Sequence, residues 1–136
     1  VVPDLAEAEI DFRVRTLEDG ARMEAALKSL RPHDPRVALE MEGGMHYPPL
    51  ERTAAVLSVY RHARAVAAEM GMDLKEISTG GASEASFAAA LGRPTLDGLG
   101  PDGDGAHAEH EHVLVTSLPA RAALAAGLIA RLQEGA

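Results

Sequence analysis

The segment from residue 98 to residue 112 concentrates the residue types that build metal sites. Four glycines lie between positions 98 and 105, and Glu109 and Glu111 alternate with three of the six histidines, His107, His110 and His112. Glycine lets a backbone turn sharply or approach a ligand closely. Neutral imidazoles beside carboxylates are the usual ligands of zinc and related metals. The segment therefore predicts a flexible loop that ends in a metal site.

The three histidines need not bind one ion. In an extended strand, positions 110 and 112 share a face, whereas position 107 does not fit that face cleanly. This spacing favours a single ligand supplied by the loop, with partners elsewhere, over a three-histidine site. Histidines on a polar surface are the alternative. The other histidines, His33, His46 and His62, are predicted to lie at the surface and are assigned no role.

The same glycines allow two further interpretations. Residues 98–103 match the string Gly-x-Gly-x-x-Gly of dinucleotide sites, but no helix is predicted after them, and Asp102 and Asp104 would repel a phosphate. The two aspartates also have a weak likeness to a calcium loop, without its third ligand or its closing glutamate. A solvated turn is the favoured interpretation.

Two other positions could contact an anion. Arg13 lies on the polar face of a predicted strand, where it either pairs with carboxylates near Glu7 or Glu9 or binds a substrate carboxylate through its planar fork. The residues alone favour the charge pair. Gly80 and Gly81 precede a helix that begins near Ser83, and their N–H groups offer a weak prediction of an anion or oxyanion site.

Periodicity predicts the elements that position these residues. Strict alternation from Ala6 to Val14 predicts a half-buried strand. Thr16 and Asp19 predict the start of a helix that ends at Arg31. Further strands are predicted at 37–41, 73–78, 94–96 and 113–115, and further helices at 51–70, 83–92 and 118–132.

Two prolines at positions 48 and 49 interrupt this pattern and predict a domain boundary, dividing the chain into residues 1–46 and 47–136. The first part is expected to be half of a small α+β sandwich. The second is expected to be an α/β layer, because its strands alternate with helices.

Composition narrows the classes of function. The 136 residues suit one domain or parts of two, and the formal net charge of −8 argues against a sequence-independent grip on nucleic acid or on an anionic membrane. Without cysteine, a zinc site must use His, Asp and Glu. No apolar run approaches the ~20 residues of a membrane span. Richness in alanine, with no Cys or Trp, fits a cytoplasmic bacterial protein, and a first residue that is not methionine suggests a start inside a larger protein.

Several motifs occur in an order and spacing that are specific together. They are Val1-Val2-Pro3 with Asp11-Phe12-Arg13, Gly43-Gly44 to Pro48-Pro49, residues 80–85, residues 94–100, Gly103 to His107, and Glu111 to Arg121. In this order the chain resembles the C-terminal part of the zinc metallopeptidase family of carboxypeptidase G, aminoacylase, acetylornithine deacetylase and succinyl-diaminopimelate desuccinylase. The resemblance covers nearly the whole chain and is greatest to the carboxypeptidase G branch.

The resemblance implies an α/β catalytic domain that carries two zinc ions and is interrupted by a ferredoxin-like α+β lid, which usually dimerises. Residues 1–46 would be the second half of the lid, and residues 47–136 the C-terminal part of the catalytic domain. His107 would bind one zinc, with cobalt or manganese as alternative metals. Arg13 would reach from the lid to the substrate carboxylate, and Gly80 and Gly81 would border the substrate.

The resemblance also implies a function. The whole protein would be a glutamate carboxypeptidase-like hydrolase that cleaves an amide or peptide bond of a small amino-acid or peptide-like substrate with metal-activated water, and it would form a homodimer through the lid. The family's other zinc ligands and its glutamate base would precede residue 1, so this segment holds no catalytic residue and is expected to be inactive alone. The alternative is a non-catalytic dimerising or binding fragment.

The chain departs from the family pattern in places. Tyr47 stands where arginine is common, which removes one expected carboxylate contact, and Glu84 stands where aspartate is commoner.

Overall fold

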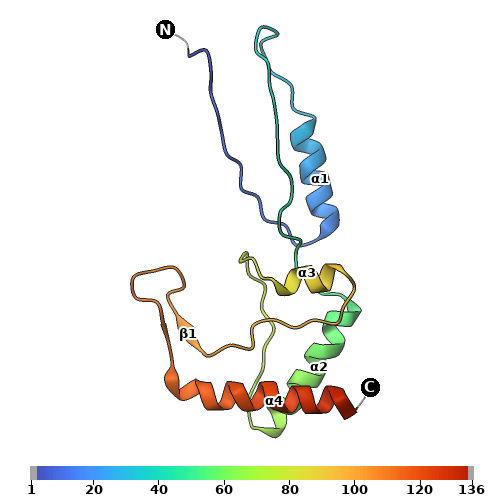
Figure 1. The fold of residues 1–136 in the computed structure, drawn as a ribbon, viewed down its shortest axis with the longest axis vertical. Helices are drawn as coiled ribbons and strands as arrows, with labels where there is room; N and C mark the ends of the chain where they lie inside the picture. The colour runs from blue at the N-terminus through green and yellow to red at the C-terminus, as the bar shows by residue number, and fades with distance from the viewer. Residues whose placement is uncertain (1–2, 135–136) are drawn as a thin grey trace.

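The computed structural model describes residues 3–134, so Val1 and Val2 of the Val-Val-Pro motif lie outside the described residues. The molecule is elongated (Figure 1). At one end, two extended segments run beside helix α1. The other end contains the remaining helices and one small sheet. The elements are α1 (Leu17–Lys28), α2 (Ala54–Glu69), α3 (Ala85–Ala90), β1 (Gly103–Asp104), β2 (His112–Val113), the 3-10 turn η1 (Val115–Ser117) and α4 (Leu118–Glu134).

The helices begin where the sequence predicts. The Thr16 hydroxyl accepts a hydrogen bond from the Asp19 N–H at 3.0 Å, and it satisfies one of the free donors of the first turn of α1. The Thr53 hydroxyl does the same for the Val56 N–H at the start of α2. Gly71 follows α2 in a left-handed conformation, with φ 72°, which glycine adopts without strain. All four predicted helices are confirmed, with ends that shift by a few residues.

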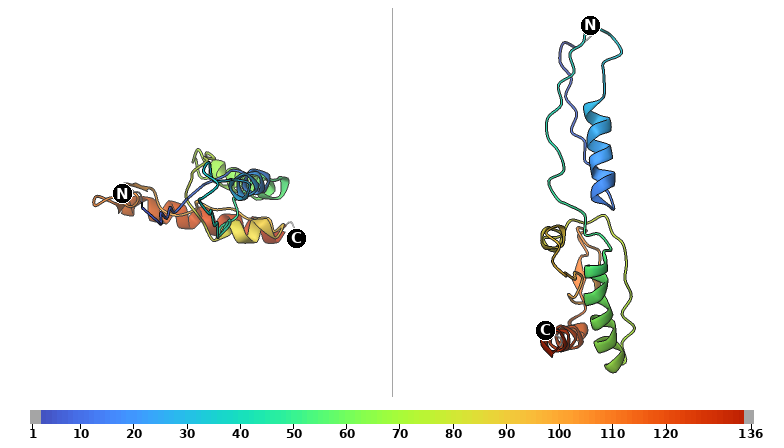
Figure 2. Two further views of the ribbon diagram at one scale, coloured as in Figure 1. Left: turned by 90° about the horizontal axis from the view of Figure 1, so that it is seen from above. Right: turned by 90° about the vertical axis from the view of Figure 1, so that its right-hand side faces the viewer.

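The core lies between α2 and α4, which cross in the lower part of the molecule (Figure 2). One face of α2 and one face of α4 supply all the buried hydrophobic side chains of the described residues. Burying them removes apolar surface from water, at about 25 cal/mol per Å². They are Val59, Ala63, Val66, Ala67, Leu124 and Leu128.

The closest approach of the two helices is at Gly127. A Cβ atom added there would lie 2.7 Å from Cγ1 of Val66, a buried and β-branched side chain that cannot move aside easily. We expect Gly127→Ala to lower the free energy of unfolding by about 1–2 kcal/mol, because overpacking outweighs the ~1 kcal/mol gain in helix propensity. Urea unfolding measures this change. In a Val66→Ala background the same substitution should no longer destabilise, and an equal loss in both backgrounds would contradict the steric explanation.

The glycine-rich segment forms a hairpin. Strands β1 and β2 pair antiparallel, with Gly103 opposite Val113 and Asp104 opposite His112. A Cβ atom at Gly103 would lie 2.2 Å from the carbonyl oxygen of His112, so only glycine fits at this position. The predicted loop is therefore a short two-stranded ribbon whose connecting turn carries His107.

Most of the predicted strands are wrong. Within residues 3–134, the segments 6–14, 37–41, 73–78 and 94–96 form no ladder, and of residues 113–115 Val113 alone pairs, since Val115 begins η1. Strands are stabilised by adjacent strands and by burial of one face. Here Ile10 and Val37 are each 55% exposed. The described fold is therefore helix-dominated with one two-stranded sheet, instead of an α/β layer, and the division at residue 46 stays a prediction.

The chain exposes far more surface than a compact monomer. Its accessible surface is 10846 Å², against about 6,800 Å² for a compact protein of this mass. The excess includes many large apolar side chains, such as Leu5, Leu39 and Ile77. The extended segments therefore present unpaired backbone and apolar side chains that another surface could cover.

The segment Val115–Glu134 is long and apolar enough to cross a membrane by length and composition, so the expectation that no segment reaches that limit is wrong. In the fold, however, Leu124 and Leu128 are buried against α2. A charged side chain of the same helix, Arg121, is bonded to the glycine-rich segment. Two side chains of this segment thus pack into the α2–α4 core, while 11% of its apolar window is buried in the described fold.

Candidate metal and substrate site

His107 lies in the turn of the β1–β2 hairpin with an unusual backbone. Its φ is 68°, and among the described residues it is the one non-glycine residue with a positive φ. This left-handed conformation costs an L-residue about 1–2 kcal/mol, and such strain clusters at functional sites. The side chain is exposed, and the backbone N–H donates to Oε2 of Glu111 at 3.4 Å. The backbone strain distinguishes His107 from His110 and His112.

The base of this hairpin is bonded to α4 and to the turn before it. The Arg121 guanidinium donates from Nε to the Gly100 carbonyl at 2.6 Å and from Nη2 to the Gly98 carbonyl at 3.0 Å. The Asp102 N–H donates to the Ser117 hydroxyl at 2.9 Å. Neither Arg121 nor Ser117 carries a role predicted from the sequence. The available signal was a charged residue inside an otherwise apolar helical stretch.

Zinc in proteins takes three or four protein ligands. Residues 3–134 contain no group of three His, Asp or Glu side chains arranged to hold a metal ion. Neither a three-histidine site nor a calcium loop is therefore formed within that part of the chain. His107 could supply one ligand, but the described residues do not by themselves fit a complete zinc site.

The neighbouring polar groups have local roles. Nδ1 of His112 lies 3.0 Å from the His110 carbonyl oxygen, and Oδ1 of Asp104 accepts the Gly105 N–H at 2.7 Å. Asp102 lies 3.8 Å from Arg121. These contacts agree with the solvated turn that the sequence favours for the two aspartates.

Arg13 and Gly80, 67 residues apart in the sequence, lie in contact. Nη1 of Arg13 donates to the Gly80 carbonyl at 2.8 Å, and Nη2 donates to Oδ2 of Asp11 at 3.3 Å. Arg13 therefore forms a charge pair, as the residues alone favour, and its partner is Asp11 of the same segment instead of Glu7 or Glu9. The Arg13 side chain is 65% exposed, so its guanidinium remains open to a solute.

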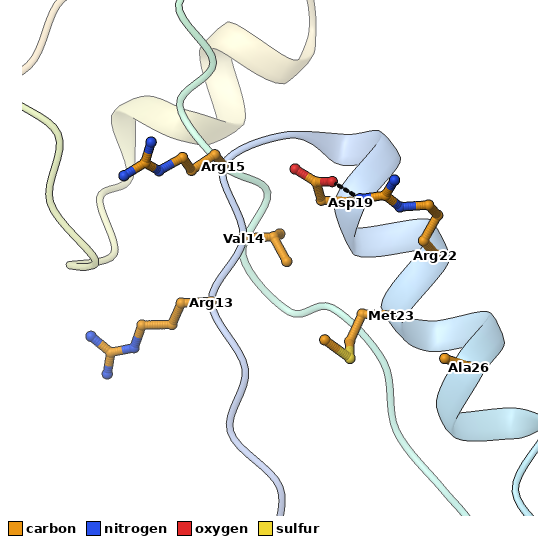
Figure 3. Close-up of a pocket in the computed structure, with 7 residues that line it drawn as sticks. All are labelled: Arg13, Val14, Arg15, Asp19, Arg22, Met23 and Ala26. Carbon is orange, nitrogen blue, oxygen red and sulfur yellow. Dashed lines mark hydrogen bonds and ion pairs between the residues drawn. The ribbon is translucent and has the colours of Figure 1, made fainter.

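An open cavity of about 490 Å³ lies between the Arg13 segment and α1 (Figure 3). Arg13 and Arg15 point to the same side, away from Val14 and Met23, as alternation in an extended segment requires. Two guanidinium groups therefore face one side of the extended segment. The lining residues are Arg13, Val14, Arg15, Asp19, Arg22, Met23 and Ala26.

In the turn at residues 79–82, one N–H group and one carbonyl group are already hydrogen-bonded within the chain. The Gly81 N–H donates to the Thr79 hydroxyl at 3.3 Å, and Gly80 uses its carbonyl to bind Arg13. The following helix α3 is a short element of 6 residues, and the Ser83 hydroxyl accepts the N–H of Ala85, its first residue. Gly80 therefore acts in this structure as an acceptor for Arg13, and the anion or oxyanion role of the N–H groups stays a prediction.

The structure does not join the two halves of the predicted site. The hairpin projects to one side of the lower part of the molecule, away from α3 (Figure 1). Among the described residues no hydrogen bond links His107 to Arg13, Gly80 or Gly81. Arg13 and Gly80 thus form one group, and His107 forms another.

The family of the chain follows from comparison with known proteins. The sequence profile of Peptidase family M20/M25/M40 matches residues 3–131. The chain belongs to this family. M20 peptidases are generally metal-dependent hydrolases, so a metallohydrolase function is the general activity that membership indicates. No curated protein and no solved structure matches the chain.

In this M20 chain, Tyr47 contacts α3. Its ring lies 5.0 Å from that of Phe87, centroid to centroid, with the planes tilted by 55°. Tilted aromatic pairs of this kind contribute about 0.5–1.5 kcal/mol beyond the area they bury. Tyr47 therefore connects the segment before Pro48 to the helix that follows the Gly80 turn.

Two glutamates of the M20 chain bind distant segments, Glu24 through a backbone N–H and Glu76 through an ion pair, and both have lowered pKa values. The backbone N–H of Met45, and after it Lys28, hold the pKa of Glu24 below its ordinary value. The Arg52 guanidinium likewise holds the pKa of Glu76 down, with bonds of 2.8 and 2.9 Å. A lowered pKa means that each contact stabilises the fold above the ordinary pKa of the carboxylate and is lost as the pH falls.

Proposed function

We propose that the protein containing this chain is a di-zinc, glutamate carboxypeptidase-like hydrolase that cleaves an amide or peptide bond of an amino-acid-derived substrate. The family match supports the hydrolase class. The observation that carries the specific assignment is the strained, exposed His107 at the turn of a hairpin whose base is bonded to α4. Strain at one exposed imidazole is expected where that imidazole must be presented to a ligand.

In this proposal His107 holds one zinc, with cobalt or manganese as alternatives, and the remaining ligands and the general base come from residues outside this chain. The bound metal would polarise the substrate carbonyl and lower the pKa of a water molecule. In this mechanism the chain would hold the His107 imidazole in a fixed direction. The turn of the hairpin and the hydrogen bonds at its base would provide this orientation.

Arg13 orients the substrate in the same proposal. A guanidinium binds a carboxylate through two parallel, charge-assisted hydrogen bonds. In the structure this guanidinium holds a neutral carbonyl, that of Gly80, and an exposed carboxylate, that of Asp11. A substrate carboxylate could take the place of Asp11 while Gly80 and Gly81 border it.

The wider proposals follow from the same assignment. The substrate is a small amino-acid or peptide-like molecule, and the protein is a cytoplasmic homodimer that pairs through a lid formed in part by residues 1–46. The net charge of −8 supports partners other than nucleic acid or an anionic membrane surface.

A second candidate function is a non-catalytic dimerising or binding fragment. The large accessible surface favours it, because the extended segments leave apolar side chains such as Ile10 and Leu39 half-exposed. A second copy of the chain could pair with these unpaired backbones by strand addition.

Zinc titration of the purified chain and of the full-length protein, each combined with a hydrolysis assay on N-acyl amino acids and dipeptides, tests the proposal. We expect stoichiometric zinc and turnover in the full-length protein, and weak zinc binding without turnover in the chain alone. Tight stoichiometric zinc with turnover in the chain alone would contradict an incomplete site. A full-length protein that dimerises with concentration but neither binds zinc nor hydrolyses these substrates would favour the second candidate.

A further inference from the structure

We propose that Arg121 is a positioning residue for the hairpin that carries His107. By binding the backbone at Gly98 and Gly100, it would hold the base of the hairpin on α4 and so fix the direction of the imidazole. This inference rests on the proposed role of His107 as a metal ligand.

The geometry around Arg121 is that of a fixed anchor. One planar guanidinium bonds two carbonyl oxygens that belong to a three-residue stretch, at 2.6 and 3.0 Å. The fork is rigid, so two bonds from it define both the place and the orientation of that stretch. The Arg121 side chain is 16% exposed, which places the group beneath the loop instead of in solvent.

A second anchor holds the hairpin just beyond the first. The Asp102 N–H donates to the Ser117 hydroxyl at 2.9 Å, and the Asp102 carbonyl accepts the Leu114 N–H at 2.7 Å. The Ser117 hydroxyl also donates to the Leu114 carbonyl at 2.7 Å. Both strands of the hairpin therefore leave from positions tied to the start of α4.

Anchoring at the base is needed because the hairpin is weak by itself. Its ladder has two residue pairs, Gly103 with Val113 and Asp104 with His112. An isolated two-stranded ribbon is marginally stable in water. Its turn also holds His107 in a conformation that costs energy. A small rotation at Gly98–Gly100 would move the imidazole by a larger distance, since it lies at the far end of the ribbon.

Arg121 is not among the buried side chains that pack α4 against α2, although Leu99, which lies between the two carbonyls that it binds, packs against the same core. The α4 residues buried against α2 are Leu124 and Leu128, whereas the bonds of Arg121 go to the loop. The helix offers a matched control in Arg131, which pairs with Glu69 of α2 and does not contact the hairpin. Arg121→Lys keeps the charge but loses the rigid planar fork that fixes the orientation of the two carbonyls, and Arg131→Lys makes the same chemical change elsewhere.

The experiment compares these two variants in the full-length protein. It measures zinc affinity by competition with a chelator, amide hydrogen exchange over residues 98–113, and the unfolding midpoint without metal. We expect Arg121→Lys to weaken zinc binding about tenfold, because mutating a residue that supports a metal ligand lowers metal affinity by about 10–100-fold. We also expect it to speed amide hydrogen exchange in the hairpin. Its metal-free unfolding midpoint should match that of Arg131→Lys, which should leave zinc affinity and hairpin exchange unchanged.

A double mutant separates this inference from the proposed function. With His107→Ala in place, Arg121→Lys should cause no further loss of zinc affinity, because the ligand that it positions is gone. An equal loss with and without His107 would overturn the positioning role. The positioning role would also be overturned if Arg121→Lys matched Arg131→Lys in zinc affinity and hairpin exchange while His107→Ala weakened zinc binding. If His107→Ala itself leaves zinc binding unchanged, the proposed function fails.

Discussion

Replacing His107 by alanine in the full-length protein is expected to lower bound zinc and turnover together, by about 100-fold or more. Residues that only support a metal ligand cost about 10–100-fold when they are changed, so loss of the ligand itself should cost more. Metal analysis of the dialysed protein and steady-state kinetics measure the two effects. They should fall in parallel, because metal chemistry cannot proceed at an empty site.

Two further variants serve as controls for this experiment. His110→Ala removes an imidazole from the same hairpin and should keep zinc and turnover, since the His110 contact to His112 uses a backbone carbonyl. His107→Gly should lose zinc as the alanine variant does, yet raise the metal-free free energy of unfolding by about 1 kcal/mol, since glycine relieves the positive φ. Unchanged zinc content in His107→Ala would remove the basis of the metal assignment.

The second large effect is expected at Arg13. Arg13→Ala should raise KM about 10–100-fold for substrates with a free carboxylate, because a hydrogen bond to a charged group contributes about 1.5–3 kcal/mol and each 1.4 kcal/mol corresponds to tenfold in binding. The KM of Arg13→Lys should lie between that of the unmodified protein and that of Arg13→Ala, since an ammonium keeps the charge but loses the fork. Steady-state kinetics with a carboxylate substrate and its amide analogue measure the effect.

The amide analogue and a second arginine provide the controls. Loss of Arg13 should change KM little for the amide, which carries no charge to bind. Arg22 lines the same cavity but pairs with Asp19 within α1, so Arg22→Ala should leave KM near that of the unmodified protein. An equal rise in KM for both substrates would show that Arg13 supports the structure of the site instead of binding the carboxylate.

Local patterns were sufficient for the helices and for the close backbone approach within the hairpin. Thr16 and Thr53 cap their helices as expected, since a cap bond involves residues only three positions apart. The crowding of glycines before His107 predicted a loop whose backbone can turn sharply or approach another group closely, and Gly103 has no room for a Cβ atom beside the His112 carbonyl. The order of motifs along the chain indicated a metallopeptidase family, and the family match over residues 3–131 confirms this coarser assignment.

The strands and the site contacts were decided by tertiary structure. Alternation at 6–14 and 37–41 describes which side chains could share a face, but a ladder forms only when another strand lies beside it. Within the described part of the chain no such neighbour is present, so these segments stay extended and exposed. The bond between Arg13 and Gly80 spans 67 residues, and that between Arg121 and Gly98 spans 23. Capping and helical periodicity act between near neighbours, whereas ladders and these guanidinium contacts require segments that only the folded chain brings together.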